Sequence, residues 1–410
     1  FPKSAFFSFD LATIGLRFCY MFSFVLPRYL RGTAKLTENA LAAKCMKLNS
    51  LKLQNFKNYS DFDIHFGSAI NCILGKNGMG KTNLLDAIHY LSMTRSALNS
   101  LDQQNISHGQ PFFAINGQLE TLAGSEKLIC YYERAKKKIF KVSGKELEKL
   151  SDHIGQVPSV LITPDDTEII REGSEVRRKF VDSVISQQDR GYLELLIAMQ
   201  RLLKQRNSFL KSNEGKQRIN LQLLSVYDEG LLPLFAKIGK VRQAFIEDFS
   251  PFFEENYRLI FDGEESPKIT FKSEVLEEDF EKAYKASIQK DVILQRTSKG
   301  PHRDDYEFRL NDRAIKKYGS QGQQKSFVIA LKLAEYDFLK SRKHFNPFLL
   351  LDDIFDKLDD ERIGRLVSLL TDKDRFSQIF ITDAREERSR AIFGQIPDVS
   401  YFEIVKGILK

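Results

Sequence analysis

Hydrophobic and polar residues alternate along several short stretches of the chain, which predicts strands at those places. Residues 47–66 alternate like two strands around an Asn58–Tyr59 turn, and residues 112–144 give three more candidates that resemble an antiparallel meander. The run at 69–74 is compact and mainly apolar, which favours a buried strand. This part of the chain is therefore expected to be rich in sheet.

A second pattern, with apolar residues three or four positions apart, predicts helices elsewhere. It runs from Asn83 to Leu91 and recurs in residues 170–290, which are charged and nearly free of Gly and Pro. No heptad repeat is sustained there, so a packed helical lobe is expected and not a long coiled-coil arm. Strand-like runs return at 268–273 and 306–310, and residues 320–410 alternate between helix and strand.

These patterns divide the chain into parts. Residues 46–165 and 293–410 are predicted as two halves of one α/β unit, and residues 166–292 as an inserted, mainly helical lobe. Residues 1–45 look foreign to the rest, and we interpret them as a non-native or disordered extension that ends before Met46.

The apolar run within residues 1–45 allows one other reading. It carries Arg17 near its middle and is shorter than the ~20 residues that a membrane helix needs. A secretory signal peptide would fit Lys3 and a cleavage-like triplet at 40–42, but the interval between the apolar run and this triplet is too long. We therefore expect no membrane association.

Composition and charge exclude little. The chain is 42% hydrophobic and 29% charged, as in ordinary globular proteins. The net charge of +7 includes +4 from residues 1–45, which hold six basic and two acidic residues, so a nucleic-acid interpretation must depend on local clusters. The four cysteines are scattered without metal-like spacing, which suits a reducing, cytoplasmic location.

The strongest chemical signal is a glycine-rich stretch between the strand at 69–74 and the helix after it. It fits the phosphate-loop pattern in full and consists of Gly75, Lys76, Asn77, Gly78, Met79, Gly80, Lys81 and Thr82. Its glycines let successive N–H groups point at phosphate oxygens, and the helix adds its positive end. Lys81 would reach the β- and γ-phosphates and Thr82 would offer its hydroxyl to Mg²⁺.

An acidic partner for this loop follows only at residues 347–353. Phe348 to Leu351 predict a buried strand, and Asp352 emerges at its carboxyl end, where open α/β sheets bind ligands. Asp352 can hold Mg²⁺, directly or through water. Asp353 is then placed to orient or deprotonate an attacking water. The alternative is an ordinary strand that ends in an acidic turn.

A third stretch, residues 318–339, has a glycine-bounded Ser-Gln-Gly-Gln-Gln directly before a helix. One interpretation is a plain N-cap by Ser320 or Gln321. The other is a second anion-binding helix start, which could close on a γ-phosphate bound by another copy of the chain.

Together these stretches resemble the ABC-type ATPase heads of chromosome-maintenance proteins, and most closely the RecF family of bacterial recombination mediators. The resemblance runs from Met46 to near the C-terminus. It is carried by NFKNY, GKNGMGKTNLLDAI, LITPDD, RRKFVD, LLKQRN, GPHRDD, GSQGQQKSF and LLLDDIFDKLDDER. It implies an α/β fold, an ABC-type (P-loop) ATPase head with a mixed sheet, split in sequence by the helical lobe.

The same resemblance implies a function. The protein would use ATP and Mg²⁺, form an ATP-dependent homodimer on single- and double-stranded, gapped DNA, and hydrolyse ATP weakly with DNA stimulation. It would assist RecA loading with RecR- and RecO-type partners in DNA repair and replication restart. By likeness, Ser320, Gly322 and Gln323 match the signature that caps the partner's ATP. Lys57 matches a basic position near the adenine, and Leu358–Asp359 match the loop that crosses the dimer interface.

The chain departs from the family pattern in three places. Relatives often carry Gln before LITP, where Val160 stands here and Gln156 is the nearest glutamine. The switch histidine of transporter ATPases has no equivalent after 378–382. Asp353 stands where most ABC ATPases use Glu, so modest turnover is expected.

The candidate DNA-binding residues are basic clusters, which also have ordinary structural explanations. Basic clusters lie at 136–138, 177–179, 201–206 and 316–317, and any one of them is more often a solvated face. The run at 300–305 favours a salt-bridged turn over a catalytic site.

Two other functions remain as alternatives to a repair ATPase. One is an ABC-transporter subunit, which would need the switch histidine. The other is a structural chromosome-organising ATPase, which would need a long heptad arm.

Overall fold

The computed structural model describes residues 46–212, 220–261, 263–343, 345–356, 359–372 and 374–410. The extension expected at residues 1–45 lies outside the described residues and stays a prediction. Residues 46–410 pack as one unit.

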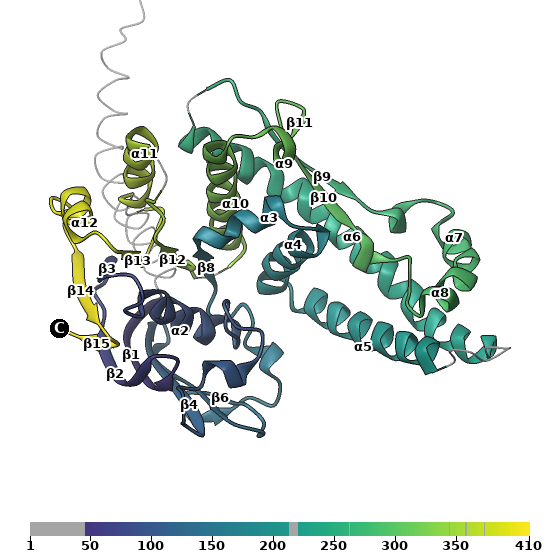
Figure 1. Ribbon diagram of the computed structural model, residues 1–410, viewed down its shortest axis with the longest axis horizontal. Helices are drawn as coiled ribbons and strands as arrows, with labels where there is room; N and C mark the ends of the chain where they lie inside the picture. Colours follow the sequence, from purple (N-terminus) through teal and green to yellow (C-terminus); the bar gives the residue numbers. More distant parts are fainter. Residues whose placement is uncertain (1–45, 213–219, 262, 344, 357–358, 373) are drawn as a thin grey trace, which may run out of the picture. The chain divides into compact units, whose positions relative to one another are not determined.

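A six-stranded sheet, called sheet B here, combines strands from both ends of the sequence (Figure 1). Its order is β15-β14-β3-β13-β12-β8; the last five strands of this order are parallel, and β15 is antiparallel to β14. The strands are β3 (Ile70–Leu74), β8 (Ser159–Ile162), β12 (Phe348–Asp352), β13 (Ile379–Asp383), β14 (Val399–Val405) and β15 (Ile408–Leu409). β3, β8, β12 and β13 are buried along their whole length, as parallel strands covered on both faces require.

An antiparallel sheet, called sheet A, contributes to one of the two apolar cores. Its order is β2-β1-β4-β5-β6-β7. The strands are β1 (Lys47–Phe56), β2 (Tyr59–His65), β4 (Phe112–Thr121), β5 (Gly124–Glu133), β6 (Ile139–Val142) and β7 (Lys145–Glu146). Helix α2 (Lys81–Met93) packs against β4 and β5 of this sheet and also against β8, β12 and β13 of sheet B. Leu84, Leu85 and Ile88 of α2 belong to this core.

The other core lies on the opposite face of sheet B, and helices supply most of its side chains. The helices that contribute to it include α3 (Glu168–Arg171), α4 (Ser174–Gln188), α5 (Arg190–Ser212), α6 (Leu221–Ile260), α7 (Phe280–Ala286) and α10 (Gln321–Arg342), and α8 (Ile288–Leu294) packs against α7. α5 packs along α6, and α6 packs along α10 (Figure 1). α6 has 40 residues, about 60 Å at 1.5 Å per residue. It therefore links the lobe to the helix that begins at the predicted signature.

A small sheet crosses the predicted boundary at 292/293. Its strands are β9 (Pro267–Lys272), β10 (Asp305–Leu310) and β11 (Arg313–Ala314), all antiparallel. The boundary also falls inside α8. Because β9 and β10 pair along their whole length, we propose that the lobe continues to the end of α9 (Ile315–Tyr318).

Most predicted elements occur where the pattern indicated them, with three differences. The turn between the first two strands is Lys57–Asn58, because Phe56 pairs with Tyr59. The sequence pattern does not predict β8 or α12 (Glu386–Phe393), whereas α11 (Asp360–Leu370) agrees with the alternation of helix and strand expected over 320–410. β8 is only four residues long, too short for a periodicity to be read.

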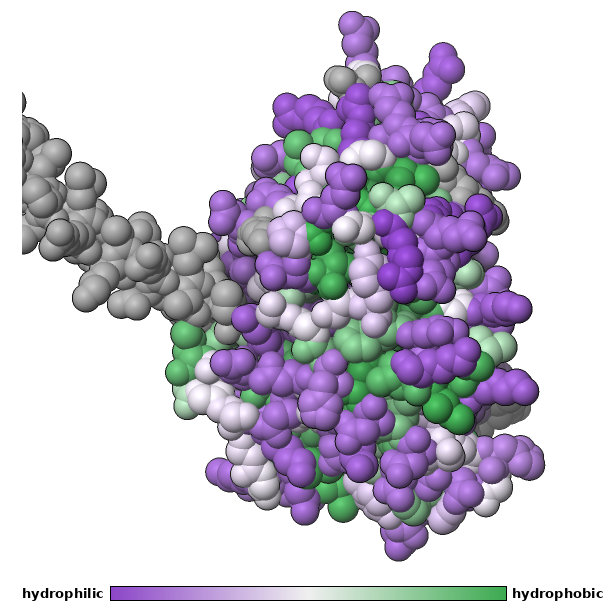
Figure 2. All heavy atoms as spheres, turned by 90° about the vertical axis from the view of Figure 1, so that its left-hand side faces the viewer, coloured by the Kyte–Doolittle hydropathy of each residue, from purple (hydrophilic) through white to green (hydrophobic). Residues whose placement is uncertain are grey.

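No helix within the described ranges is both long and apolar enough to cross a membrane. On the face shown in Figure 2, hydrophilic side chains cover most of the surface and hydrophobic side chains appear between them in smaller groups.

Arg206 of α5 is expected to be essential for the stability of the lobe. Its side chain is fully buried and bonds Asp228 at 2.7 Å and Asp291 at 2.8 Å. Arg206→Met would leave two carboxylates buried without their cation, so we expect a loss of about 3–5 kcal/mol in the free energy of unfolding. Chemical denaturation measures it. Arg201→Met, on the exposed side of the same helix, is the control, and equal losses would contradict the prediction.

Candidate nucleotide-binding site

The predicted phosphate loop joins the end of β3 to the start of α2. Gly75 and Gly80 have φ of +150° and +111°, which side-chain-bearing residues rarely adopt. A Cβ on Gly75 would lie 2.4 Å from the carbonyl oxygen of Ile404, and one on Gly80 would lie 2.3 Å from Nδ2 of Asn58. The loop therefore requires glycine at both positions for backbone and for space.

Neighbouring side chains hold the loop through its carbonyl groups. Asn58 Nδ2 donates to the carbonyl of Met79 at 3.2 Å, and the Tyr59 hydroxyl donates to that of Gly80 at 2.9 Å. Lys81 is buried, and its Nζ donates to the carbonyl of Lys76 at 3.3 Å. Since such loops bind phosphate with their N–H groups, these bonds do not compete with a ligand.

Asp352 and Thr82 meet, although 270 residues separate them in sequence. The hydroxyl of Thr82 lies 3.0 Å from both carboxylate oxygens of Asp352. The Thr382 hydroxyl, next to Asp352 in the β12–β13 register, donates to the same carboxylate at 2.7 Å. Burial raises the pKa of Asp352, against the lowering effect of these two hydroxyls and Lys81. A hydroxyl and a carboxylate in contact are suitable oxygen ligands for Mg²⁺.

Asp353 differs from Asp352 in both backbone and surroundings. Its φ is +43°, a sparsely populated conformation for a residue with a side chain, which costs on the order of 1–3 kcal/mol. Its N–H donates to the Thr382 hydroxyl at 3.0 Å. Its Oδ1 is buried and, within the described part of the chain, has no hydrogen-bond partner. Burial raises the pKa of Asp353, while Lys81 lowers it. The strain and the free oxygen are typical of a functional position.

Thr382 is the contact that the sequence did not reveal. It stands near the place of the missing switch histidine, and its hydroxyl contacts both acidic residues. Asp383 beside it has another role, since it accepts a bond from Arg388 at 2.6 Å and one from Ser389 at 2.7 Å. The available signal was a hydroxyl residue at the carboxyl end of a buried strand.

Lys57 lies in the turn between β1 and β2, beside the start of α2. Its Nζ forms a buried ion pair with Asp86 at 2.6 Å, and Asp86 also accepts bonds from Ser96 and Ala97. The amine is therefore held by a carboxylate of α2, and its predicted position near an adenine stays a prediction.

The signature residues form the first turn of α10, whose start next to α9 lies well away from α2 (Figure 1). Ser320 and Gln323 form a reciprocal cap: the Ser320 hydroxyl accepts from Gln323 N–H at 3.2 Å, and Gln323 Oε1 accepts from Ser320 N–H at 2.7 Å. A Cβ on Gly322 would lie 2.5 Å from Nη1 of Arg362 in α11. The glycine thus allows the close approach of this guanidinium, which a side chain would displace. The plain N-cap interpretation is confirmed, and the anion-binding interpretation is compatible with it.

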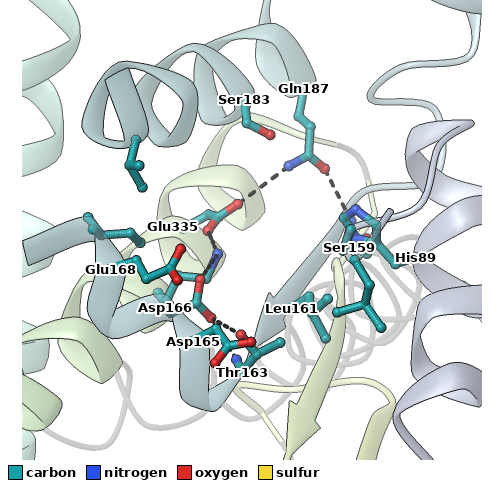
Figure 3. A pocket seen from close by; sticks show the side chains of 15 residues that line it. His89, Ser159, Leu161, Thr163, Asp165, Asp166, Glu168, Ser183, Gln187 and Glu335 are labelled. Atoms are coloured by element: carbon teal, nitrogen blue, oxygen red, sulfur yellow. Dashed lines mark hydrogen bonds and ion pairs between the residues drawn. The ribbon is translucent and has the colours of Figure 1, made fainter. Parts of the chain in front are cut away.

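A cavity of about 450 Å³ lies beside β8, between α2, α4 and α10 (Figure 3). Lys332 and Glu335 of α10 form a buried ion pair at 2.9 Å in its wall, and Gln187 of α4 donates to Glu335 at 3.5 Å. β8 runs parallel to β12 with Ile162 opposite Leu351, so the turn after β8 emerges beside Asp352. Asp165 in that turn contributes to the raised pKa of Asp352. Val160 itself is fully buried in β8.

Several basic residues of the predicted clusters form ion pairs or hydrogen bonds that hold parts of the fold together. Arg177 bonds Asp305 at 2.7 and 3.1 Å, and Arg178 donates to the carbonyl of Asp304 at 2.6 Å. Lys138 pairs with Asp102 at 2.8 Å. In the run at 300–305, Asp304 also accepts a buried bond from Arg242 at 2.7 Å. The interpretation of that run as a salt-bridged turn is confirmed.

The sheet, the loop and its distant aspartate define an ABC-type ATPase head of the kind found in chromosome-maintenance proteins. Residues 47–396 match the family model described as RecF/RecN/SMC N terminal domain. The chain is 45% identical over 347 residues to the DNA replication and repair protein RecF of Flavobacterium johnsoniae, covering 85% of this chain and 96% of the relative. It is 44% identical to the same-named protein of Cytophaga hutchinsonii, over 88% and 96%. The chain belongs to the RecF family.

Solved structures agree with this assignment. A structure of the recombination mediator protein RecF with ATPrS, in the RecFOR pathway, is 30% identical, has a TM-score of 0.79 and covers 90% of this chain and 98% of its own. The Smc head domain from Pyrococcus furiosus, at 17% identity and a TM-score of 0.54, shows the fold alone. The predicted fold class is confirmed, and the transporter-subunit alternative is excluded by the family.

Proposed function

We propose that this protein is an ATP-dependent DNA-binding dimer of recombinational repair and replication restart, with weak, DNA-stimulated ATP hydrolysis. The contact between Thr82 and Asp352 carries the proposal, because it unites a phosphate loop with an acidic strand end. Asp353 comes next in sequence, and its buried Oδ1 has no hydrogen-bond partner among the described residues. These are the parts that phosphoryl transfer to water needs.

Each residue would have a distinct part in hydrolysis. The loop N–H groups and Lys81 would hold the phosphates, and Thr82 and Asp352 would hold Mg²⁺, which supplies charge neutralisation at the transferred phosphoryl group. Asp353 would orient the attacking water and accept its proton. A pKa raised by burial makes this carboxylate a better proton acceptor than an ordinary exposed aspartate.

The other half of the site would come from a second copy. The first turn of α10 carries Ser320, Gly322 and Gln323, is capped by Ser320 and Gln323 themselves, and lies away from α2 of the same chain (Figure 1). Such a helix end attracts phosphate, so ATP bound by one copy would draw in the α10 start of another. Leu358 lies outside the described residues, and Asp359 caps α11.

Partners and setting follow from the family. The relatives' name, DNA replication and repair protein, supports action on DNA, and the RecFOR-pathway structure supports RecR- and RecO-type partners. Action at gapped, single- and double-stranded DNA in the cytoplasm and assistance to RecA loading are part of the proposal. A structural chromosome-organising role would need a long heptad arm, whereas the lobe helices α5 and α6 pack against each other and α6 packs against α10.

ATPase rate and sedimentation test this function together. With ATP and Mg²⁺, the protein should sediment as a dimer, and gapped double-stranded DNA should raise its hydrolysis rate several-fold. The controls are ADP in place of ATP and buffer in place of DNA. A monomer under all conditions would contradict the ATP-driven dimer, and an unchanged rate with DNA would contradict the repair function.

A further inference from the structure

The basic clusters of the chain differ in whether the protein itself uses their charges. Arg177, Arg178, Arg206 and Lys138 have carboxylate or carbonyl partners inside the protein. These side chains hold elements together, so they cannot serve as free phosphate contacts. The cluster at 316–317 is different.

Residues 313–318, Arg-Ala-Ile-Lys-Lys-Tyr, form β11 and α9 and expose most of their side chains. Arg313, Lys316 and Lys317 are exposed, and 67% of Tyr318 is accessible. In the described ranges, none of the three cations forms an ion pair; Lys316 only reaches the carbonyl of Glu172, at 3.4 Å. The one acidic side chain beside them in sequence is Asp312. We call Arg313, Lys316, Lys317 and Tyr318 the α9 surface.

Three exposed cations within five residues, with no ion pair among the described residues, suit a polyanion. Phosphate oxygens of nucleic acid lie along a regular backbone, and short basic runs bind them without reading sequence. Tyr318 adds an exposed aromatic ring directly after these cations in sequence. At a gap in duplex DNA, unpaired bases are available to stack on such a ring.

The α9 surface is also fastened to the first turn of α10. Gln324 Nε2 donates to the carbonyls of Ile315 at 3.4 Å and Gly319 at 3.1 Å. Gln324 Oε1 accepts from Arg171 of α3 at 2.9 Å. A ligand that binds α9 and shifts it would therefore also shift the start of α10, which would cap the ATP bound by a second copy.

We propose that the α9 surface binds gapped DNA, with Arg313, Lys316 and Lys317 on the phosphates and Tyr318 against an unpaired base. The inference rests on the proposed function and names its DNA-binding surface. It also gives a physical route for DNA stimulation, because DNA held at α9 would order the start of α10 through Gln324.

The test measures binding of fluorescent gapped duplex DNA by anisotropy, over a series of salt concentrations. Lys316→Ala/Lys317→Ala should bind about tenfold more weakly, and the slope of log K against log salt should become shallower by about 2. Lys137→Ala/Lys179→Ala, which removes two exposed lysines of other clusters, is the matched control. An equal loss in the control would overturn the inference, because total charge would then matter and not location.

Two further readouts separate the inference from the proposed function. Without DNA, the α9 double variant should dimerise and hydrolyse ATP at the parent rate, and only its stimulation by DNA should be lost. Tyr318→Ala should weaken binding to gapped DNA but not to continuous duplex. If the parent binds no DNA, the proposed function fails; if the parent binds and the double variant matches it in affinity and slope, only this inference fails.

Discussion

Replacing Lys81 by Met is expected to lower the affinity for ATP by about 100-fold or more. Lys81 is buried, forms no ion pair among the described residues, and donates to the carbonyl of Lys76 at 3.3 Å. Its charge lowers the pKa of Asp352 and Asp353 without contacting either carboxylate directly, so the amine remains available to phosphate. Removing one partner of a desolvated charge pair costs about 2–5 kcal/mol, and 1.4 kcal/mol is tenfold in Kd. Isothermal titration with ATP and Mg²⁺ measures the loss.

The control for Lys81→Met removes a lysine elsewhere. Lys137→Met takes away an exposed charge outside the loop and should leave the Kd for ATP within about twofold. The melting temperature of Lys81→Met should stay near that of the parent, since Lys81 forms no direct ion pair among the described residues. ATP affinity unchanged in Lys81→Met would refute the assignment of the loop.

The parts of the site that local sequence determines could be predicted. The loop at 75–82 needs glycines at fixed spacing because its backbone conformation and its close neighbours forbid a Cβ. β12 is evident from four consecutive apolar residues after Pro347, and Asp352 from its position at their end. Each of these signals lies within about ten residues, so no knowledge of packing is needed.

The rest depends on residues that meet only after folding. The contact of Thr382 with Asp352 comes from the β12–β13 register, and the approach of Arg362 to Gly322 comes from the packing of α11 on α10. Neither partner is close in sequence. The length of α6 is hidden for another reason: it contains Pro233 and Pro251, which normally end or kink a helix.

The basic clusters also show that contacts between residues distant in sequence cannot be predicted from the sequence pattern. The sequence groups Arg177 with Arg178, and only the fold reveals that both face Asp304 and Asp305. A run of cations in sequence cannot distinguish side chains that brace β10 from side chains that remain free for a ligand. The pairing of charges is a tertiary property.

Asp353→Asn is expected to lower the rate of ATP hydrolysis by about 100- to 10,000-fold while leaving ATP binding intact. An amide keeps the shape and the backbone bond to Thr382 but cannot accept a proton from water, and loss of a general base costs that much. Since the phosphates are held by other residues, ATP should still bring two copies together. The variant should therefore accumulate as a dimer in sedimentation with ATP, in contrast to Lys81→Met, which should stay monomeric.

Asp356→Asn is the matched control, because Asp356 lies in the same turn but its side chain is half exposed and pairs with Arg388 at 3.1 Å. If general negative charge beside the loop sets the rate, both variants should slow equally. If Asp353 alone accepts the proton, Asp356→Asn should keep its rate within a few-fold of the parent. Hydrolysis by Asp353→Asn at the parent rate, measured as phosphate release, would show that the base is another residue, and the strained backbone at Asp353 would then serve only to turn the chain after β12.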